Sequence, residues 1–258
     1  MRQAVIVQLE RIAATRYVTP LREGGSLPAL VEASDDGLYV LKFRGAGQGR
    51  KALVAEVVAG ELARALGLLV PRLALVELDP VLGRAEPDPE IQDLLVASAG
   101  LNLGVDFLPS ALPYSPAVGP APAADLAAAV VWFDALVTNI DRTAQNPNLL
   151  LWHDRLWLID HGAALYFHHA AERDPTHARS PFSAIREHVL LPFAGSIRAA
   201  DERLAPQVTE SVLEDVAAAL PDEWLDGDDR RTYVDYLLER LESPRSFPEE
   251  AERARVER

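Results

Sequence analysis

Residues 126–136, LAAAVVWFDAL, constrain the fold of this chain more than any other segment. We interpret them as an apolar helix with Asp125 as its N-cap, and such a helix has no polar face to present to solvent. Other elements must therefore surround it. The chain has 258 residues, 49% of them hydrophobic, so it can bury this helix within one large domain or between two small lobes.

Mainly strands are expected before this helix. Short apolar segments with Gly, Asp or Pro at their ends predict strands at 17–21, 29–32, 38–43 and 70–78. Apolar residues at helical spacing predict a helix at 51–66, with Gly67 as its C-cap, and a short helix near 91–97. No helix or strand is assigned to the stretch LNLGVDFLP, 101–109. The first part of the chain should therefore be rich in β-structure.

Mainly helices are expected after it. A β-hairpin comes first, with strands at 148–152 and 156–159. Helices are predicted at 204–220 and 230–241, and the charged segment 249–258 is interpreted as a solvated or frayed tail. The second part should therefore be mainly helical.

A proline-rich segment, 110–125, marks the clearest boundary between these two parts. It predicts an N-lobe at 1–110 and a C-lobe at 111–258. The order of the elements predicts an α+β fold with two lobes, of which the first is rich in strands and the second is mainly helical.

Charge and composition argue against several classes of function. The formal net charge of −14 disfavours nucleic-acid binding, because phosphate backbones are bound by clustered cations. No apolar run reaches the roughly 18–20 residues that span a bilayer, and the absence of cysteine favours a cytoplasmic location. Lys42 and Lys51 are the only lysines among 25 basic residues. Because the chain uses arginine for most of its basic positions, Lys42 inside a predicted strand suggests a specific role for lysine there.

The segment NIDRTAQNPNLLL, 139–151, carries a pattern of polar residues suited to phosphoryl transfer. Asp141 lies five residues before Asn146, and Asp160 ends the second predicted strand of the hairpin. Because a hairpin folds back on itself, Asp160 should return close to Asn146, where carboxylate and amide oxygens suit Mg²⁺. Asn148 is an alternative ligand to Asn146. Asp141 would lie beyond the metal, where it could orient an attacking hydroxyl or accept its proton, although the same residues could also serve only to form a turn.

The first part of the chain offers complementary groups. Gly24, Gly25 and Ser26 form a predicted tight turn whose backbone N–H groups could approach phosphate oxygens. Lys42 lies in a predicted strand with apolar neighbours, so its ammonium needs a partner in an enclosed place. Glu56, on the following helix, is the candidate partner. A lysine paired with a helix glutamate holds the α- and β-phosphates in kinases.

Together these residues resemble the pattern of the HipA-like kinases, a family related in fold to phosphatidylinositol and protein kinases. The family pattern of Asp-Arg, three residues and Asn is present as Asp141, Arg142 and Asn146. The aspartate that binds metal at the end of the hairpin matches Asp160. The resemblance implies that Asp141 is catalytic and that Asn146 and Asp160 bind Mg²⁺.

The same resemblance extends to the first part of the chain. The lysine that contacts phosphate matches Lys42, and the helix glutamate 11 residues before the glycine of a Leu-Gly pair matches Glu56, before Gly67. The resemblance implies a kinase-like fold that binds ATP through Lys42 and the 24–26 turn, with Lys42 and Glu56 in the catalytic machinery. The expected reaction is transfer of the γ-phosphoryl group of ATP to a hydroxyl group, such as that of a protein serine or threonine.

Other functions remain open on the sequence alone. A nucleotide-binding pseudokinase that acts as a regulatory module is favoured by Thr143 and Gln145, where the family often has His and Lys. A kinase of small molecules or lipids is a second alternative. An aminoglycoside-kinase-like fold is disfavoured, because its pattern expects His where this chain has Asn139. Residues 166–198 are interpreted as an activation or substrate-binding segment.

Overall fold

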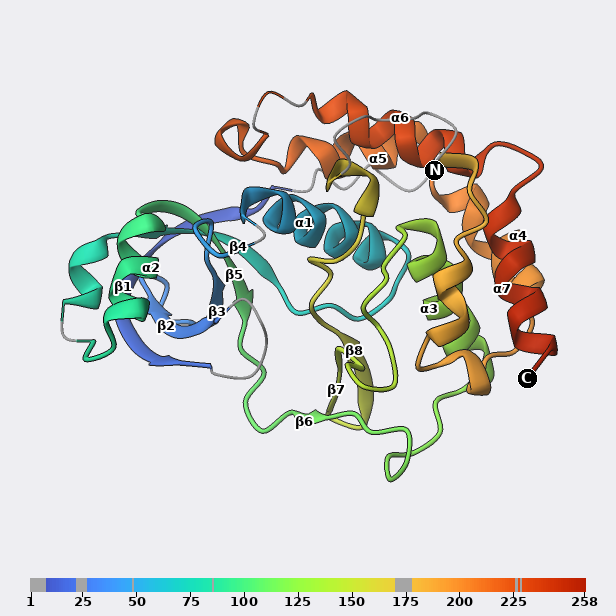
Figure 1. Cartoon of the computed structure of the whole chain (residues 1–258), viewed down its shortest axis with the longest axis horizontal. Coiled ribbons are helices and arrows are strands. Elements are labelled where there is room, and N and C mark those ends of the chain that lie inside the picture. The colour runs from blue at the N-terminus through green and yellow to red at the C-terminus, as the bar shows by residue number, and fades with distance from the viewer. Residues whose placement is uncertain are drawn as a thin grey trace.

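A computed structural model describes residues 8–21, 27–47, 49–84, 86–169, 178–225, 227 and 229–258 of the chain. The fold is α+β, as predicted. A strand barrel lies at one end of the molecule and most of the helices lie at the other, with helix α1 between them (Figure 1). Among the described residues, no helix is long and apolar enough to cross a membrane.

Five strands form a small closed barrel in the order β1-β2-β3-β5-β4. Antiparallel pairs join neighbouring strands, and a parallel pairing of β1 with β4 closes the barrel. The strands are β1 (Glu10–Pro20), β2 (Ala29–Ala33), β3 (Leu38–Lys42), β4 (Leu73–Leu78) and β5 (Gly100–Asp106). Four of them overlap the predicted strands, although β1 begins earlier than expected. Closure removes the exposed edges that an open sheet of this size would have.

Strand β5 was not predicted, because its inward residues are not apolar. Asn102 and Gly104 face the barrel interior, while Leu101 and Leu103 face a different core. A Cβ atom on Gly104 would lie 2.6 Å from a side-chain carbon of Val76, so only glycine fits there. The usual alternation of apolar inward residues is therefore missing from this strand.

Helix α1 (Gly49–Ala65) is buried along most of its length. Gly67 follows it with φ of +80°, as expected for a C-cap. The buried side chains of α1, such as Leu53 and Leu62, share one apolar core with the outer faces of β4 and β5 and with the helices of the second part. A separate, smaller core fills the barrel, and helix α2 (Pro89–Ala97) packs on it through Ile91 and Leu95. The larger core therefore continues across the predicted boundary at 110–125.

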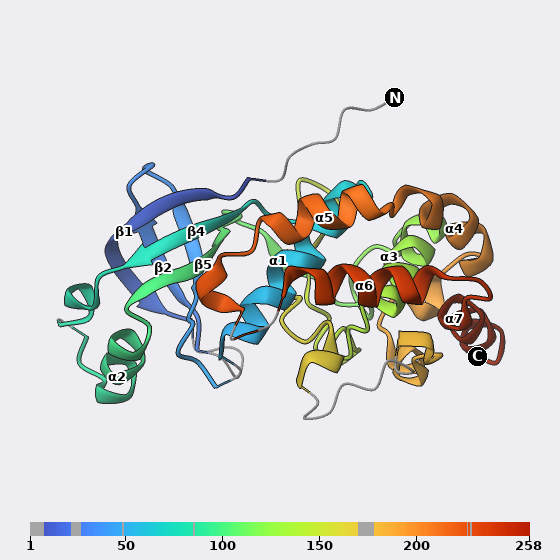
Figure 2. The same cartoon turned by 90° about the horizontal axis from the view of Figure 1, so that it is seen from above.

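Helix α3 (Ala124–Leu136) is the apolar helix predicted at 126–136, and its side chains from Ala127 to Leu136 are buried on all sides. The other helices of this part are α4 (Ile197–Leu204), α5 (Glu210–Ala218), α6 (Arg230–Leu241) and α7 (Ser246–Val256). Helix α3 contacts α4, α6 and α7. Helices α5 and α6 lie above α1 in Figure 1, on the side from which Figure 2 is seen. Short 3₁₀ helices lie at η1 (Pro80–Gly83), η2 (Tyr166–His169), η4 (Ser183–Glu187), η5 (Leu191–Phe193), η6 (Ala205–Gln207) and η7 (Asp222–Trp224).

The predicted hairpin is present as β7 (Leu149–Trp152) and β8 (Arg155–Leu158), and β6 (Leu112–Pro113) pairs with β7. Its turn uses His153 and Asp154, both with positive φ, which suits a tight two-residue hairpin. This small sheet lies below α1 and α3 in Figure 1. Residue 160 therefore follows β8 at the end of the hairpin that lies away from the turn.

Two predicted helix boundaries were wrong. Ala123, not Asp125, occupies the N-cap position of α3, and Asp125 lies in the first turn. The helix predicted at 204–220 is interrupted, because α4 ends at Leu204 and η6 contains Pro206. Thr209 then caps a new helix by accepting a hydrogen bond from the Val212 N–H at 3.3 Å. Proline lacks the N–H that a continuous helix needs, so the break follows from the sequence.

The interpretation of 249–258 as a solvated tail was also wrong. Most of this segment belongs to α7, and Ala251 and Ala254 are buried in the large core. Phe247, in the first turn of α7, is 1% exposed and packs against Trp132 of α3 at a ring-centroid distance of 5.7 Å. The end of the chain therefore helps to bury the central helix.

Phe247→Ala tests this packing. Removing a buried aromatic ring leaves a cavity, so we expect the variant to lose about 3–5 kcal/mol of unfolding free energy. Val256→Ala is the control, because Val256 is 68% exposed on the same helix, and it should change stability by about 0.5 kcal/mol or less. Urea unfolding of both variants measures the difference. Equal, small losses would show that α7 does not contribute to the core.

Candidate active site

A cluster of three charged side chains joins three separate elements. Lys42, at the end of β3, donates from Nζ to Oε1 of Glu56 on α1 and, at 2.6 Å, to Oδ1 of Asp160 after β8. Lys42 and Glu56 are largely buried, whereas 47% of the Asp160 side chain is exposed. The structure thus brings together three predicted site residues that are separated by up to 118 positions in the sequence.

Opposite charges keep Lys42 and Glu56 of this cluster in their ionised forms. Burial lowers the pKa of the Lys42 ammonium, but Glu56 and Asp160 outweigh burial and the net shift is upward. Burial likewise raises the pKa of Glu56, but Lys42 and His161 together outweigh burial and the net shift is downward. Burial and the nearby Glu56 carboxylate raise the pKa of Asp160 in spite of Lys42. With both carboxylates ionised, the cluster has one negative charge in excess, which favours a further cation beside the exposed Asp160.

The backbone after Asp160 lets α1 come close. Asp160 has φ of +55°, a conformation that aspartate tolerates better than most residues. A Cβ atom on Gly162 would lie 3.3 Å from Oε1 of Glu56, tighter than an ordinary contact. The sequence Asp-His-Gly at 160–162 therefore turns the chain and leaves room for the glutamate that holds Lys42.

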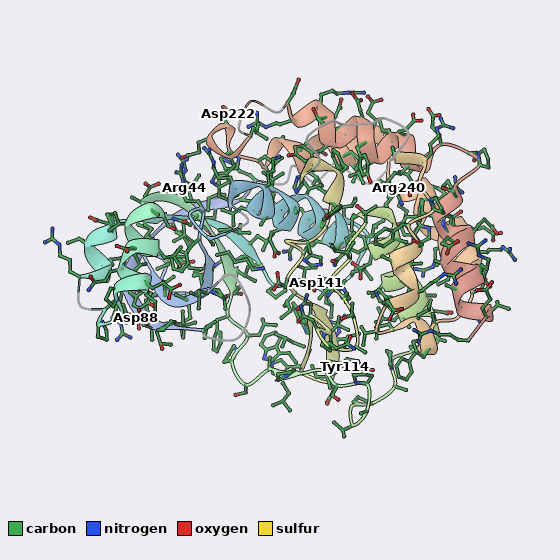
Figure 3. The ribbon with its side chains drawn as sticks, viewed as in Figure 1. Arg44, Asp88, Tyr114, Asp141, Asp222 and Arg240 are labelled. Carbon is green, nitrogen blue, oxygen red and sulfur yellow. The ribbon has the colours of Figure 1, made fainter. Side chains whose placement is uncertain are left out.

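The loop 139–148 places Asp141 beside two asparagines. Oδ2 of Asp141 accepts a hydrogen bond from Nδ2 of Asn146 at 2.7 Å and from Nδ2 of Asn148 at 3.3 Å. Figure 3 shows Asp141 near the middle of the molecule, below α1 and between the barrel and the helices. The structure therefore brings Asp141 and Asn146 together, and it places Asn148 with them.

A buried aspartate on α3, which no sequence pattern indicated, holds this loop. Asp134 is the polar residue within the segment interpreted as wholly apolar, and it is 0% exposed. Its carboxylate accepts hydrogen bonds from Nδ2 of Asn139 at 3.0 Å and from Nε of Arg142 at 2.6 Å. Oδ1 of Asn139 in turn accepts from the Asp141 N–H at 3.2 Å. Asp134 thus fixes the residues on both sides of Asp141.

Arg142 extends the same network to the hairpin. Its Nη1 donates to the carbonyl of Asn148 and, at 3.2 Å, to that of Ile159. The Ile159 N–H also donates to the carbonyl of Asn148 at 3.1 Å. Ile159 directly precedes Asp160, so Arg142 links the 139–148 loop to the backbone that positions Asp160. Asp160 and Asn146 share no hydrogen bond with each other, and these neighbours link the two.

Burial raises the pKa of Asp134, but Arg142 and His188 together outweigh burial and the net shift is downward. Asp134 therefore remains ionised inside the apolar core. The predicted phosphate turn, Gly24, Gly25 and Ser26, lies outside the described residues.

The pattern that defines HipA-like kinases matches residues 15–244. The chain belongs to the HipA-like kinase family. Membership places it among the phosphotransferases and implies ATP as the phosphoryl donor. The match covers the Lys42–Glu56–Asp160 cluster and the whole 139–148 loop.

Known proteins resemble this kinase in fold rather than in sequence. It is similar to the Helicobacter pylori proinflammatory kinase CtkA, with a TM-score of 0.59, 13% identity, and coverage of 96% of this chain and 98% of the other. It is also similar to the Golgi casein kinase, with a TM-score of 0.47, 14% identity, and coverage of 97% and 73%. No curated protein matches the sequence.

Asp134→Asn tests the buried network. The change leaves the Arg142 charge without its partner, so we expect a loss of about 3–5 kcal/mol of unfolding free energy at pH 7. Asp235→Asn is the control, because Asp235 forms an exposed i,i+4 pair with Arg231 and should lose about 0.5 kcal/mol or less. Urea unfolding compares the two. A loss no larger than that of the control would show that Asp134 does not carry a buried charge.

The same variant predicts a pH dependence. The pKa of Asp134 is lower in the folded than in the unfolded chain, so the unfolded chain binds more protons in acid and the stabilisation declines as pH falls. The difference in unfolding free energy between wild type and Asp134→Asn should be largest above the pKa of an unfolded aspartate, about 4, and should shrink below that pH. Urea unfolding at pH 3 to pH 7 measures this. A difference in unfolding free energy that grows as pH falls would show that folding raises the pKa of Asp134 and does not lower it.

Proposed function

We propose that this kinase transfers the γ-phosphoryl group of ATP, bound with Mg²⁺, to the hydroxyl group of a protein serine or threonine. The contact that carries the proposal is the pairing of the Lys42 ammonium with both Glu56 and Asp160. A lysine oriented by a helix glutamate is the arrangement that holds α- and β-phosphates in protein kinases. Lys42 is one of only two lysines among the 25 basic residues of the chain, and the use of lysine here supports the same role.

The residues present fit a magnesium ion. Asn146 commits its Nδ2 to Asp141, so the oxygen of the same amide points elsewhere and can bind a metal. Asp160 is half exposed and has a second carboxylate oxygen besides the one bonded to Lys42. An amide oxygen and a carboxylate suit Mg²⁺, which keeps several waters and binds through substrate phosphates. When bound, the ion would neutralise the charge that develops on the transferred phosphoryl group.

Asp141 is the proposed catalytic residue. Two amide groups donate to its Oδ2, which fixes the orientation of the carboxylate. Its other oxygen would accept a hydrogen bond from the acceptor hydroxyl and orient the attacking oxygen in line with the phosphate. The 139–148 loop, held by Asp134, would keep this oxygen in place during the reaction.

The same proposal assigns roles to the 24–26 turn and to the two lobes, and it gives a location for the protein. Gly24, Gly25 and Ser26 would cover the phosphates through backbone N–H groups. An N-lobe of 1–110 and a C-lobe of 111–258 would enclose the nucleotide, with the Lys42–Glu56–Asp160 cluster where they meet. The cytoplasm, with its ATP and reducing conditions, is the proposed location.

Binding of ATP with Mg²⁺ should raise the melting temperature, because a ligand that binds only the folded chain stabilises it by mass action. At 100 times the dissociation constant the gain is about 2.7 kcal/mol, or roughly 5–10 °C for a chain of this size. Asp160→Asn should lose most of the part of this increase in melting temperature that depends on Mg²⁺.

Asp154→Asn, in the exposed hairpin turn, is the control and should keep the full increase in melting temperature. Differential scanning fluorimetry with and without Mg²⁺ separates the two. An unchanged shift in Asp160→Asn would remove Asp160 from the metal site.

Asp141→Ala should slow phosphoryl transfer by a factor of about 10² to 10⁴, because a positioned proton acceptor is lost. ATP binding should survive. The measurement is transfer of ³²P from γ-labelled ATP to dephosphorylated casein and to the kinase itself, with Asp154→Asn as the control.

Two outcomes would change the proposal. Transfer by Asp141→Ala at the wild-type rate would show that another residue is catalytic. A wild type that binds ATP and Mg²⁺ but transfers no label to protein, lipid or small-molecule acceptors would favour the pseudokinase.

A further inference from the structure

The segment around 183–191 is docked on the loop that carries Asp141. Thr143 and His188 form an isolated antiparallel bridge, and the Val189 N–H donates to the carbonyl of Arg142 at 3.1 Å. The segment belongs to the stretch interpreted as an activation or substrate-binding segment. Its backbone therefore contacts the residues directly after Asp141.

The imidazole ring of His188 strengthens this docking from the buried side. It is 3% exposed, and its Nε2 lies 2.8 Å from Oδ2 of Asp134. Its Nδ1 accepts a hydrogen bond from the Leu190 N–H at 3.0 Å. Because Nδ1 is the acceptor, Nε2 carries the proton and donates to Asp134. The two hydrogen bonds therefore fix one tautomer of the neutral ring.

The charges around the ring agree with a neutral histidine. The charges of Asp134 and Arg142 balance each other, and Arg258 adds a further positive charge that acts on the ring. Burial lowers the pKa of His188, and the attraction of Asp134 does not reverse this shift. A second proton would also place an N–H on Nδ1 against the N–H of Leu190. His188 therefore supplies a hydrogen bond to Asp134 without adding a charge.

We propose that His188 is a positioning residue for phosphoryl transfer, holding Asp134 and, through it, the 139–148 loop in the geometry that places Asp141. The inference rests on the proposed function. Asp134 Oδ2 is shared by His188 and Arg142, so the ring sets the direction from which Arg142 approaches. Arg142 in turn holds Asn148 and Ile159, on the two sides of the proposed site. The hydrogen bonds of His188 involve none of Lys42, Glu56 and Asp160, so His188 should act on the rate and not on ATP binding.

Two substitutions of His188 each keep one of its two ring hydrogen bonds and remove the other. His188→Gln keeps an N–H near the position of Nε2, so it preserves donation to Asp134 and loses the acceptor for Leu190. His188→Asn keeps an acceptor near Nδ1 and loses donation to Asp134. His153→Asn, in the exposed turn of the hairpin, is the matched control. The assay is steady-state transfer of ³²P from ATP with Mg²⁺ to dephosphorylated casein, and hydrogen exchange of 139–148 is measured on the same proteins.

We expect His188→Asn to lower kcat by about 10- to 100-fold, because a small displacement of a catalytic group has a large effect on rate. KM for ATP should stay within about twofold, as for an interaction that acts only on the transition state. His188→Gln should retain kcat within about threefold of wild type. Exchange of the 139–148 amides should accelerate in His188→Asn and remain at the wild-type rate in His188→Gln and His153→Asn.

A kcat at the wild-type value in His188→Asn, or an equal loss of kcat in both His188 variants, would overturn the inference.

If the wild type transfers no phosphate, the proposed function fails, and hydrogen exchange then tests the positioning role. Faster exchange of the 139–148 amides in His188→Asn supports that role, and unchanged exchange refutes it. If His188→Asn does not fold, the ¹⁵N chemical shifts of the His188 ring in the wild type test the inference by giving its tautomer. A protonated Nε2 with a bare Nδ1 at pH 7 supports the inference, and the opposite tautomer refutes it.

Discussion

The structure of the candidate site depends on one buried carboxylate, Asp134. An ionised group inside an apolar helix bundle costs several kcal/mol unless hydrogen bonds and an opposite charge offset the loss of water. Asp134 obtains these from Asn139, Arg142 and His188. The requirement to satisfy the charge therefore dictates where the 139–148 loop and the 183–191 segment can lie. The loop conformation is a consequence of this burial and not of turn propensity alone.

The Lys42–Glu56–Asp160 cluster has a different electrostatic character. The Asp134 network is closed, since its negative charge is balanced by Arg142 in a site without solvent. The Lys42 cluster has two carboxylates for one ammonium, and one of them is half exposed. The first arrangement fixes a backbone, whereas the second leaves a charge to be balanced by a ligand cation. The two clusters meet through Ile159 and Asp160, so the rigid network positions the reactive one.

The large core explains how residues so far apart in sequence stay together. Helix α1 carries Glu56, and its other side chains pack with β4, β5 and the helices around α3. The barrel is thus attached to the second part by packing along α1, and not only by the linker at 110–125. This shared core holds Lys42 and Asp160 at a fixed separation, although it also means that the predicted boundary between lobes is not a gap in the apolar packing.

Local sequence determined most of the elements and the identity of the chemical groups. Apolar residues at helical spacing predicted α1, and a continuous apolar run predicted α3. The hairpin turn suited its positive φ angles, and the spacing of Asp141, Asn146 and Asp160 indicated phosphoryl transfer. Each of these signals lies within one helix or within one hairpin and the loop before it. Strand β5 was missed because Asn102 and Gly104 fit a barrel interior that only distant strands create. The roles of Asp134 and His188 were missed for the same reason. A single aspartate among apolar residues, or a histidine 54 positions away, gives no local pattern, and only the packed structure decides that the two share a hydrogen bond.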